Sequence, residues 1–339
     1  MKTNLTRRRI AQASLLSFFG IAGIAGIAGL AQAQSAAPAQ KWPDKAVRIV
    51  AAGPAGGSAD IIARLVADSL SKESGQPVMV DPKPGAGGVL AVNDLSQSPH
   101  DGYTVLVGVN SLVSEIPHII KMRNDMSKEI KPVAELGRGG LVMVGGPSVP
   151  AKNFGELMSW IKTHPGKVSY ASYTAGTVSH VIGLQLNKAA GIDMTHVGYK
   201  GSTPALTDVM GGHVQLMFDG MATSLPMIKS GKVKAFAVST PKRSPLLPDV
   251  PTFAELGYPQ LETVAWMGLW VKPDVPAAVQ NNIREAMLKV VAQPAVRMRL
   301  LDLGLEAVPS RTPEELSKSL GADYQRVGEV LKSIDFKPE

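Results

Sequence analysis

The sequence predicts an α/β fold with mostly parallel sheets, and three observations support this. Short apolar runs of strand length alternate with longer stretches in which apolar residues recur at helical spacing. Several strand-like runs end in a small-residue turn that opens a helix, which is typical of parallel βα units. The loops after residue 41 are short, and no long structureless segment separates the elements. These features together favour compact α/β domains.

The first βα unit begins with the apolar run 47–52, which has the length of a buried strand. Gly56 and Gly57 follow, and glycine adopts positive φ without steric cost. Ser58 or Asp60 can cap the helix that starts there, whose apolar residues continue at helical spacing to about residue 70. A helix start presents free N–H groups and a partial positive charge, so the turn is a place for an anion. It lacks the lysine of a phosphate loop and the G-x-G-x-x-G spacing of a dinucleotide site, so an ordinary βα connection stays open.

The remaining elements follow in the same alternation. Residues 78–80 form a short strand before the glycine turn 84–88, and the next helix runs to about Gln97. The β-branched run 103–109 predicts a strand that ends at Asn110 and Ser111. Further strands are expected at 141–144, 168–171, 195–197, 214–218 and 233–238, and helices at 153–163, about 178–190, 276–292, 294–303 and 312–332.

The turn 172–177 repeats the chemistry of the first glycine turn. It follows a strand and opens a helix, with Thr177 or Ser179 as cap candidates. Hydroxyls and free backbone N–H groups at such a turn suit carboxylate oxygens. His180 could donate a hydrogen bond to the anion, or it could be a helix residue satisfied by its neighbours. Two facing helix starts could hold the two ends of a dicarboxylate, or one carboxylate between them.

Composition excludes several classes of function. The chain of 339 residues has no cysteine, which removes disulfides, thiolate catalysis and thiolate metal sites. The six histidines are isolated and lack H-E-x-x-H spacing, so we expect neither a metal nor a cofactor. Lysine and arginine are scattered without a basic stripe, which makes nucleic-acid binding improbable.

The first 33 residues have the pattern of an export signal. A basic start, Arg7-Arg8-Arg9, precedes the apolar stretch 15–30 and the A-x-A cleavage site Ala31-Gln32-Ala33. The signal holds four basic residues and no acid, so the net charge of +7 falls to +3 for the mature chain. We expect a periplasmic protein, with general secretion and the twin-arginine route both open as export routes. A retained membrane anchor is the alternative to cleavage.

Short motifs spread over the whole mature chain resemble those of one family, the tripartite tricarboxylate transporter receptors, also called the Bug family of periplasmic solute-binding proteins. Each motif alone is unspecific, whereas their order and spacing are highly specific. The matching motifs are Trp42-Pro43-Asp44-Lys45, Gly56-Gly57-Ser58-Ala59-Asp60, Gly75-Gln76-Pro77-Val78, Lys83-Pro84-Gly85-Ala86-Gly87-Gly88, Asp101-Gly102-Tyr103-Thr104, Pro165-Gly166-Lys167-Val168-Ser169-Tyr170, Tyr199-Lys200-Gly201 and Leu247-Pro248-Asp249-Val250-Pro251-Thr252.

The resemblance implies a two-lobed type II periplasmic binding protein fold with the ligand cleft between the lobes. The signal peptide (1–33) and a linker (34–41) would precede a discontinuous lobe 1 (42–140 plus 267–339) and lobe 2 (141–266), with crossings near 138–142 and 262–268. Such a receptor binds a carboxylate-bearing solute and passes it to membrane subunits of a tripartite transporter. We expect it to act as a monomer.

Carried over by position, the resemblance and the strand ends imply a set of ligand-binding residues. The two loops and the neighbouring strand ends contribute Gly57, Ser58, Asp60, Asn110, Ser111, Tyr173, Thr174, Ala175, Gly176, Thr177, His180 and Asp219. Asp219 could accept a hydrogen bond from an ammonium or hydroxyl group of the ligand, or serve as a turn or cap residue.

Departures from the family pattern suggest a ligand class. The family commonly has Pro-aromatic where this chain has Ala52-Gly53, and smaller residues at Tyr173 and Thr174; it often has Pro in place of Gly198. An aromatic ring lost at 53 makes room, and one gained at 173 offers a ring face. We therefore expect a bulkier carboxylate, such as a phthalate-type diacid, stacked on Tyr173. A Tyr173 that only packs against its lobe is the alternative.

Two other functions are alternatives to a transport receptor. A sensor subunit that presents its ligand to a membrane signalling protein would have the same fold. An exported hydrolase would need a nucleophile paired with a base, but no G-x-S-x-G elbow is present. Ser69-Leu70-Ser71-Lys72 matches S-x-x-K by spacing only, without its S-D-N and K-T-G partners. We therefore expect no enzyme activity.

Overall fold

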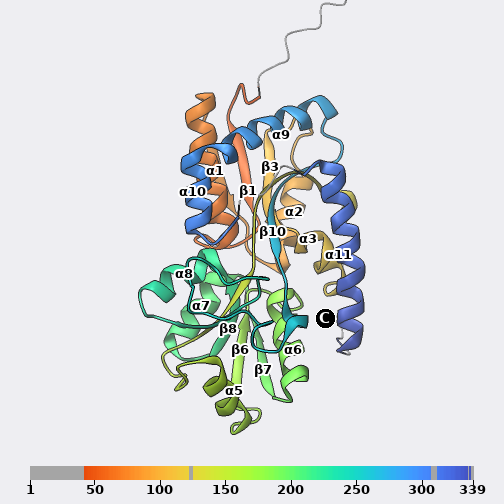
Figure 1. Cartoon of the computed structure of the whole chain (residues 1–339). Helices are drawn as coiled ribbons and strands as arrows, with labels where there is room; N and C mark the ends of the chain where they lie inside the picture. Colours follow the sequence, from red (N-terminus) through yellow and green to blue (C-terminus); the bar gives the residue numbers. More distant parts are fainter. Residues whose placement is uncertain (1–41, 122–124, 307–310, 335, 337–339) are drawn as a thin grey trace, which may run out of the picture. The chain divides into compact units, whose positions relative to one another are not determined.

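The structure, a computed structural model, describes residues 42–121, 125–306, 311–334 and 336 (Figure 1). The predicted export signal (1–33) and linker (34–41) lie outside these residues. Within residues 42–336, two five-stranded sheets are each covered by helices on both faces. Both sheets are mixed rather than purely parallel.

The first sheet has the strand order β2-β1-β3-β10-β4. β1 pairs in parallel with β2 and β3, whereas β10 runs antiparallel to both β3 and β4, so four of its five strands share one direction. The strands are β1 (Val47–Ala51), β2 (Val78–Pro82), β3 (Thr104–Val109), β4 (Lys131–Gly139) and β10 (Ala265–Val271).

The second sheet repeats this plan in the order β7-β6-β8-β5-β9. β6 pairs in parallel with β7 and β8, and β5 is antiparallel to β8 and β9. The strands are β5 (Leu141–Gly145), β6 (Val168–Ser172), β7 (Met194–Gly198), β8 (Leu216–Gly220) and β9 (Lys234–Val238).

Alternation along the strands separates two cores on the first sheet, because successive side chains point to opposite faces. Ile49 and Ala51 pack beneath α1 (Ser58–Ser74), α9 (Ala277–Ala292) and α10 (Pro294–Asp302). Val50 packs on the other face, under the helices α2 (Val89–Ser96), α3 (Ser111–Ser114), α4 (Met126–Glu129) and α11 (Pro313–Ser333). We call this sheet and its helices the first lobe.

The second sheet is covered in the same way. Met143 and Phe218 face α5 (Phe154–Lys162) and α6 (Val178–Ala190), whereas Val144 and Met217 face α7 (Ser202–Gly211) and α8 (Met221–Lys229). We call this sheet and its helices the second lobe. Three short 3₁₀ turns complete the described elements, at Ala86–Gly88, Ile116–His118 and Pro259–Leu261.

The chain passes from the first sheet to the second between β4 and β5, and returns between β9 and β10. The C-terminal helix α11 also reaches the second lobe: Leu331 packs with Val181 of α6 and with Ile119 (Figure 1). The residue boundaries of the two lobes stay a prediction.

Most predicted elements lie within two residues of their observed bounds. The strands β4 and β10 and the helices α7 and α8 were not among the expected elements. Among the described residues, no helix is both long and apolar enough to cross a membrane.

Candidate functional site

The pocket lies where helices begin after the carboxyl ends of strands from both sheets. In open α/β sheets this edge is where ligands bind. Its cavity volume is about 140 Å³, and six strand-to-helix connections line it, three from each lobe. The lining residues of these connections are Ala52, Gly53, Pro54, Gly57, Ser58 and Ala59; Gly85, Gly87 and Gly88; Val109 and Ser111; Tyr173, Thr174 and Thr177; Lys200, Gly201 and Ser202; and Gly220, Met221 and Ala222.

Glycine occupies the N-cap position of four helices that start at this pocket. Gly57 precedes α1, Gly88 precedes α2, Gly201 precedes α7 and Gly220 precedes α8. A serine, threonine or aspartate would accept hydrogen bonds from the first amides, but glycine has no side chain to do so. At these helix starts no cap side chain therefore competes with a ligand for the first amides or for the positive end of the helix dipole, although Val89 N–H at the start of α2 already donates to Ala86 C=O.

Asp60 holds the first loop in shape. Its Oδ2 accepts hydrogen bonds from Gly56 N–H (2.8 Å) and from Arg64 Nε (3.0 Å), and the residue is buried. Gly57 and Ser58 line the pocket, whereas Asp60 is not among the lining residues. The carboxylate thus ties the loop to α1, behind the residues that face the cavity.

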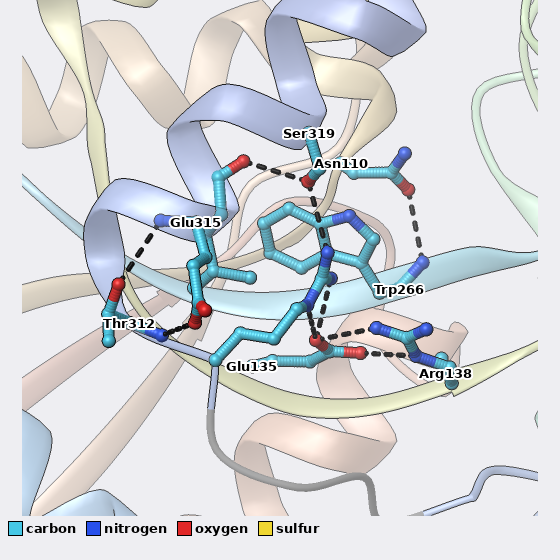
Figure 2. Close-up of polar contacts among 9 residues, drawn as sticks. Asn110, Glu135, Arg138, Trp266, Thr312, Glu315 and Ser319 are labelled. Carbon is cyan, nitrogen blue, oxygen red and sulfur yellow. Dashed lines mark hydrogen bonds and ion pairs between the residues drawn. The ribbon is translucent and has the colours of Figure 1, made fainter.

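Asn110 and Ser111 follow β3 at the start of α3, and the two residues have different surroundings. Ser111 lines the pocket. Asn110 connects the end of β3 to β10: its Oδ1 accepts a hydrogen bond from Trp266 N–H at 3.1 Å (Figure 2). Its own main-chain N–H donates to Trp266 C=O at 3.0 Å. Asn110 is not among the lining residues.

In the second loop, Tyr173, Thr174 and Thr177 line the pocket, while Ala175 and Gly176 do not. The Thr177 hydroxyl donates to Thr174 C=O (2.7 Å), which fixes the turn instead of capping α6. Burial raises the pKa of Tyr173 well above its usual value, so this phenol stays neutral at the pocket wall.

His180 supports this loop from behind. Its Nδ1 accepts a hydrogen bond from Gly176 N–H (2.8 Å), and its ring stacks on His196 with 3.5 Å between centroids. Burial lowers the pKa of His180 to about 4, so the ring is neutral near pH 7. It is not a lining residue.

The start of α6 already holds a carboxylate of the protein. Glu115, which follows α3 in the first lobe, accepts a hydrogen bond from Val178 N–H through Oε2 at 2.7 Å. Burial raises the pKa of Glu115 to about 7. This interlobe hydrogen bond occupies an amide that the sequence had indicated as an anion site.

Asp219 organises two helix starts that the sequence analysis had not found. The carboxylate is fully buried and accepts hydrogen bonds from the hydroxyls of Ser202 (2.5 Å), Thr223 (2.6 Å) and Ser224 (2.7 Å). Burial raises the pKa of this carboxyl. Asp219 is not a lining residue. Its hydrogen bonds join the first turns of α7 and α8, and residues of these two turns line the pocket. Gly201, which follows β7 after two residues, and Gly220, the last residue of β8, were the sequence signal for these starts.

The pocket wall carries one cation and no acid. Lys200 is the only charged residue that lines it within the described chain. The apolar part of the wall includes Ile62, Leu141, Trp266, Met267 and Leu305. No group of three or more acidic or histidine side chains among the described residues could hold a metal ion. Contact of each predicted residue with a ligand stays a prediction.

Comparison with known proteins identifies the family. The sequence model of the tripartite tricarboxylate transporter family receptor matches residues 62–336. A UPF0065 protein of Bordetella bronchiseptica is 36% identical over 304 residues, which cover 89% of this chain and 90% of the relative. A Rhodopseudomonas palustris protein solved with adipate is 27% identical, with a TM-score of 0.83, over 88% of this chain and 100% of its own.

MatC from the same organism, solved with bound malate, is 30% identical, with a TM-score of 0.77, over 86% of this chain and 100% of its own. These similarities confirm the two-lobed binding-protein fold and the predicted family. This family consists of solute-binding receptors and not of enzymes, which removes the hydrolase alternative. The chain belongs to the tripartite tricarboxylate transporter receptor family.

Proposed function

We propose that this receptor captures a carboxylate-bearing small molecule in the periplasm and passes it to the membrane subunits of a tripartite transporter. The observation that carries the proposal is the composition of the pocket wall. Four helices with glycine N-caps start there, Lys200 lines it, and no aspartate or glutamate is among its described lining residues. Such a wall favours an anion, and its described lining offers no carboxylate to a cation.

The pocket's two predicted acids support this reading. Asp60 and Asp219 are both buried and both accept hydrogen bonds from the protein itself. Arg64 offsets the charge of Asp60 in an ion pair, and three hydroxyl groups hydrogen-bond the Asp219 carboxyl behind the wall. The relatives solved with adipate and with malate are consistent with a carboxylate as the captured solute.

We further propose that the carboxylate is aromatic, such as a phthalate-type diacid. Tyr173 lines the pocket together with apolar residues that include Met221, Trp266 and Leu305. A neutral phenol ring at a largely apolar wall can stack on an aromatic acid, and such pairs contribute about 0.5–1.5 kcal/mol beyond burial. An aliphatic acid would lack this contribution.

The test is a thermal-shift screen of the purified protein, followed by calorimetric titration. The panel contains adipate, malate, phthalate, benzoate and, as a cationic control, lysine methyl ester. A ligand that binds only the folded state raises the apparent melting temperature by mass action. We expect shifts with carboxylates alone, and the largest with phthalate. A screen in which no carboxylate shifts the melting temperature contradicts the proposal.

Tyr173→Leu and Tyr173→Phe separate the aromatic proposal from the general one. Leucine removes the aromatic ring, so we expect the affinity for phthalate to fall about fivefold in Tyr173→Leu. Phenylalanine keeps the ring, so the affinity of Tyr173→Phe for phthalate should equal that of the wild type. Adipate affinity should change in neither variant. Equal phthalate affinity in all three proteins would leave a carboxylate receptor without the aromatic preference.

The membrane partner requires a separate experiment. Crosslinking of the receptor in intact cells, followed by mass spectrometry, should capture the membrane subunits of the transporter. Capture of a membrane signalling protein in their place would favour the sensor alternative. Sedimentation of the purified receptor tests the monomer that we propose.

A further inference from the structure

The C-terminal helix α11 is anchored in the first lobe over most of its length. Leu316 and Leu320 are buried in the same core as Val50 of β1. Further along the helix, the ring of His118 from the first lobe stacks on Tyr324 with 4.0 Å between centroids, and His118 Nε2 lies 2.8 Å from Tyr324 C=O. These contacts make α11 part of the first lobe.

The end of the same helix contacts α6 of the second lobe (Figure 1). Leu331 is 5% exposed and packs in one cluster with Val181 of α6 and with Ile119 of the first lobe. One polar contact joins the two helices as well: Lys188 Nζ of α6 donates to Ser333 C=O at 2.8 Å. We call these interactions the α6–α11 contact.

The α6–α11 contact lies outside the pocket. None of its residues is among the described residues that line the cavity. It is also separate from the two strand-to-strand passages between the lobes, which run from β4 to β5 and from β9 to β10. Substitution of Leu331 or Lys188 therefore changes a contact between the lobes and leaves the residues of the pocket wall as they are.

Opening of the lobes should break this contact. Two-lobed binding proteins close on a ligand by hinge motion of their lobes. The helix should follow the first lobe, because its leucines are buried there and because Arg311, just before it, forms an ion pair with buried Glu135 at 2.7 Å. The part of α11 that meets α6 is its last turn, and Lys188 on the other side is exposed.

We propose that the end of α11 is a latch that engages α6 when the lobes close and releases it when they open. In the ligand-free receptor the open form prevails and the α6–α11 contact is lost. The latch stabilises the closed form and raises the affinity for every solute by the same factor, because apparent affinity scales with the fraction of protein in the binding-competent form. This inference goes beyond the proposed function, since it does not depend on the chemical class of the solute.

Two buried leucines of α11 provide the first test. Leu331 (5% exposed) belongs to the α6–α11 contact, and Leu320 (4% exposed) packs only in the core of the first lobe. Calorimetric titration with adipate, malate and phthalate should show that Leu331→Ala weakens each acid that the wild type binds by the same factor, about fivefold. Leu320→Ala should stay within about 1.5-fold of wild type. Unchanged affinities in Leu331→Ala, unequal factors among the acids, or an equal loss in Leu320→Ala would each overturn the latch.

Two exposed lysines test the polar part of the latch without removing core packing. Lys188 and Lys289 each lie in the last turn of a helix, α6 and α9, so both interact with the same end of a helix dipole. Only Lys188 reaches the other lobe. We expect Lys188→Gln to weaken every bound acid about threefold and Lys289→Gln to leave affinity within about 1.5-fold of wild type. Equal affinities of the two variants would contradict a role of this hydrogen bond in closure.

A crosslink tests the motion itself and needs no solute. The chain has no cysteine, so Lys188→Cys with Ser333→Cys introduces its only two thiols, both at exposed positions of the α6–α11 contact. A short bismaleimide should join them and hold the lobes closed. Small-angle X-ray scattering of the ligand-free double variant should then give a smaller radius of gyration after crosslinking than before it.

The crosslink separates the latch from the proposed function. An unchanged radius of gyration, or thiols that the reagent does not join, would overturn the latch. A wild type that binds none of the three acids would contradict the carboxylate receptor, and the scattering experiment would still decide whether the end of α11 leaves α6 when the lobes open.

Discussion

The Glu115 carboxylate of the first lobe accepts a hydrogen bond from Val178 N–H, the first amide of helix α6 in the second lobe, at 2.7 Å. The two residues are far apart in sequence and meet only because the lobes are in contact. Burial raises the pKa of Glu115 to about 7; Arg326 opposes this shift, and Asp323 adds to it. The charge state of one side chain is thereby linked to an interlobe contact.

Glu115→Gln should remove a pH dependence of folding stability. Because the folded pKa of about 7 exceeds the usual 4.5, stability from this group is fully present below pH 4.5 and is lost as pH rises to about 7. The shift corresponds to about 3 kcal/mol. We would measure the free energy of unfolding of both proteins by denaturant from pH 4.5 to 8. The value for wild type minus the value for the variant should fall by roughly this amount as the pH rises.

The difference between the two proteins is the quantity to compare, because other groups titrate in the same range. Burial lowers the pKa of His180 to about 4 and of His196 to about 3, so these two lose their contribution as pH falls below 6.5. Their effect is common to both proteins and cancels. A difference that does not change with pH would mean that Glu115 titrates normally.

Ser58→Pro should weaken carboxylate binding through the loss of one main-chain donor. Proline is tolerated at the first helical position, and Gly57 before it is extended with φ −79° and ψ 167°. We expect helix α1 to persist while carboxylate affinity falls about tenfold by calorimetry.

Ser58→Ala is the matched control, since it removes the hydroxyl and keeps the N–H. Its affinity should drop by less than about threefold. If the alanine and proline variants lose affinity equally, the hydroxyl and not the amide holds the anion.

Gly201→Ala should impair closure of the pocket. Gly201 has φ +125°, and a Cβ there would lie 2.4 Å from Pro54 Cδ of the first lobe. The side chain would push the lobes apart, so we expect more than about a tenfold loss of ligand affinity by titration.

Gly191→Ala controls for backbone strain alone. Gly191 also has positive φ (+60°), but a Cβ there would meet nothing within 4 Å. We expect about 1 kcal/mol lower stability and unchanged affinity. Equal affinity losses in both variants would show that strain, and not interlobe contact, is responsible.

Asp219→Asn should destabilise the second lobe. The amide replaces an acceptor oxygen with a donor where three hydroxyls donate, so at least one hydrogen bond is lost. Denaturant unfolding should show a loss of about 2 kcal/mol, against less than about 0.5 kcal/mol for exposed Asp193→Asn. A variant as stable as wild type would mean that the hydroxyls can reorient toward an amide.

The sequence predicted the βα units well where periodicity and glycine turns coincide, as in β1, the loop 52–57 and α1. It did not predict β10, although Ala265–Val271 is an apolar run of strand length. The pairing of β10 with β3 and β4, more than 100 residues earlier in the chain, is not encoded in any local pattern.

From the sequence we could predict which types of residue form the site, but only part of what each residue does there. Ser58 and Thr174 line the pocket, as expected for hydroxyls at helix starts. The polar atoms of Asp219 and His180 are paired with Ser202 and Gly176, and a sequence does not state which partner a polar side chain finds after folding. Residue type predicts a core or interlobe position for Trp266, and the structure places this buried residue in the lining of the pocket.

The glycine N-caps have a consequence for how this receptor can change over generations. The amides that they leave free belong to the main chain, which every substitution except proline retains. Point mutations can therefore reshape the wall at Tyr173, Trp266 or Met221 while the anion anchor persists. A duplicated gene for such a receptor therefore inherits the main-chain donors for the anion, and only the side chains of the pocket wall have to diverge.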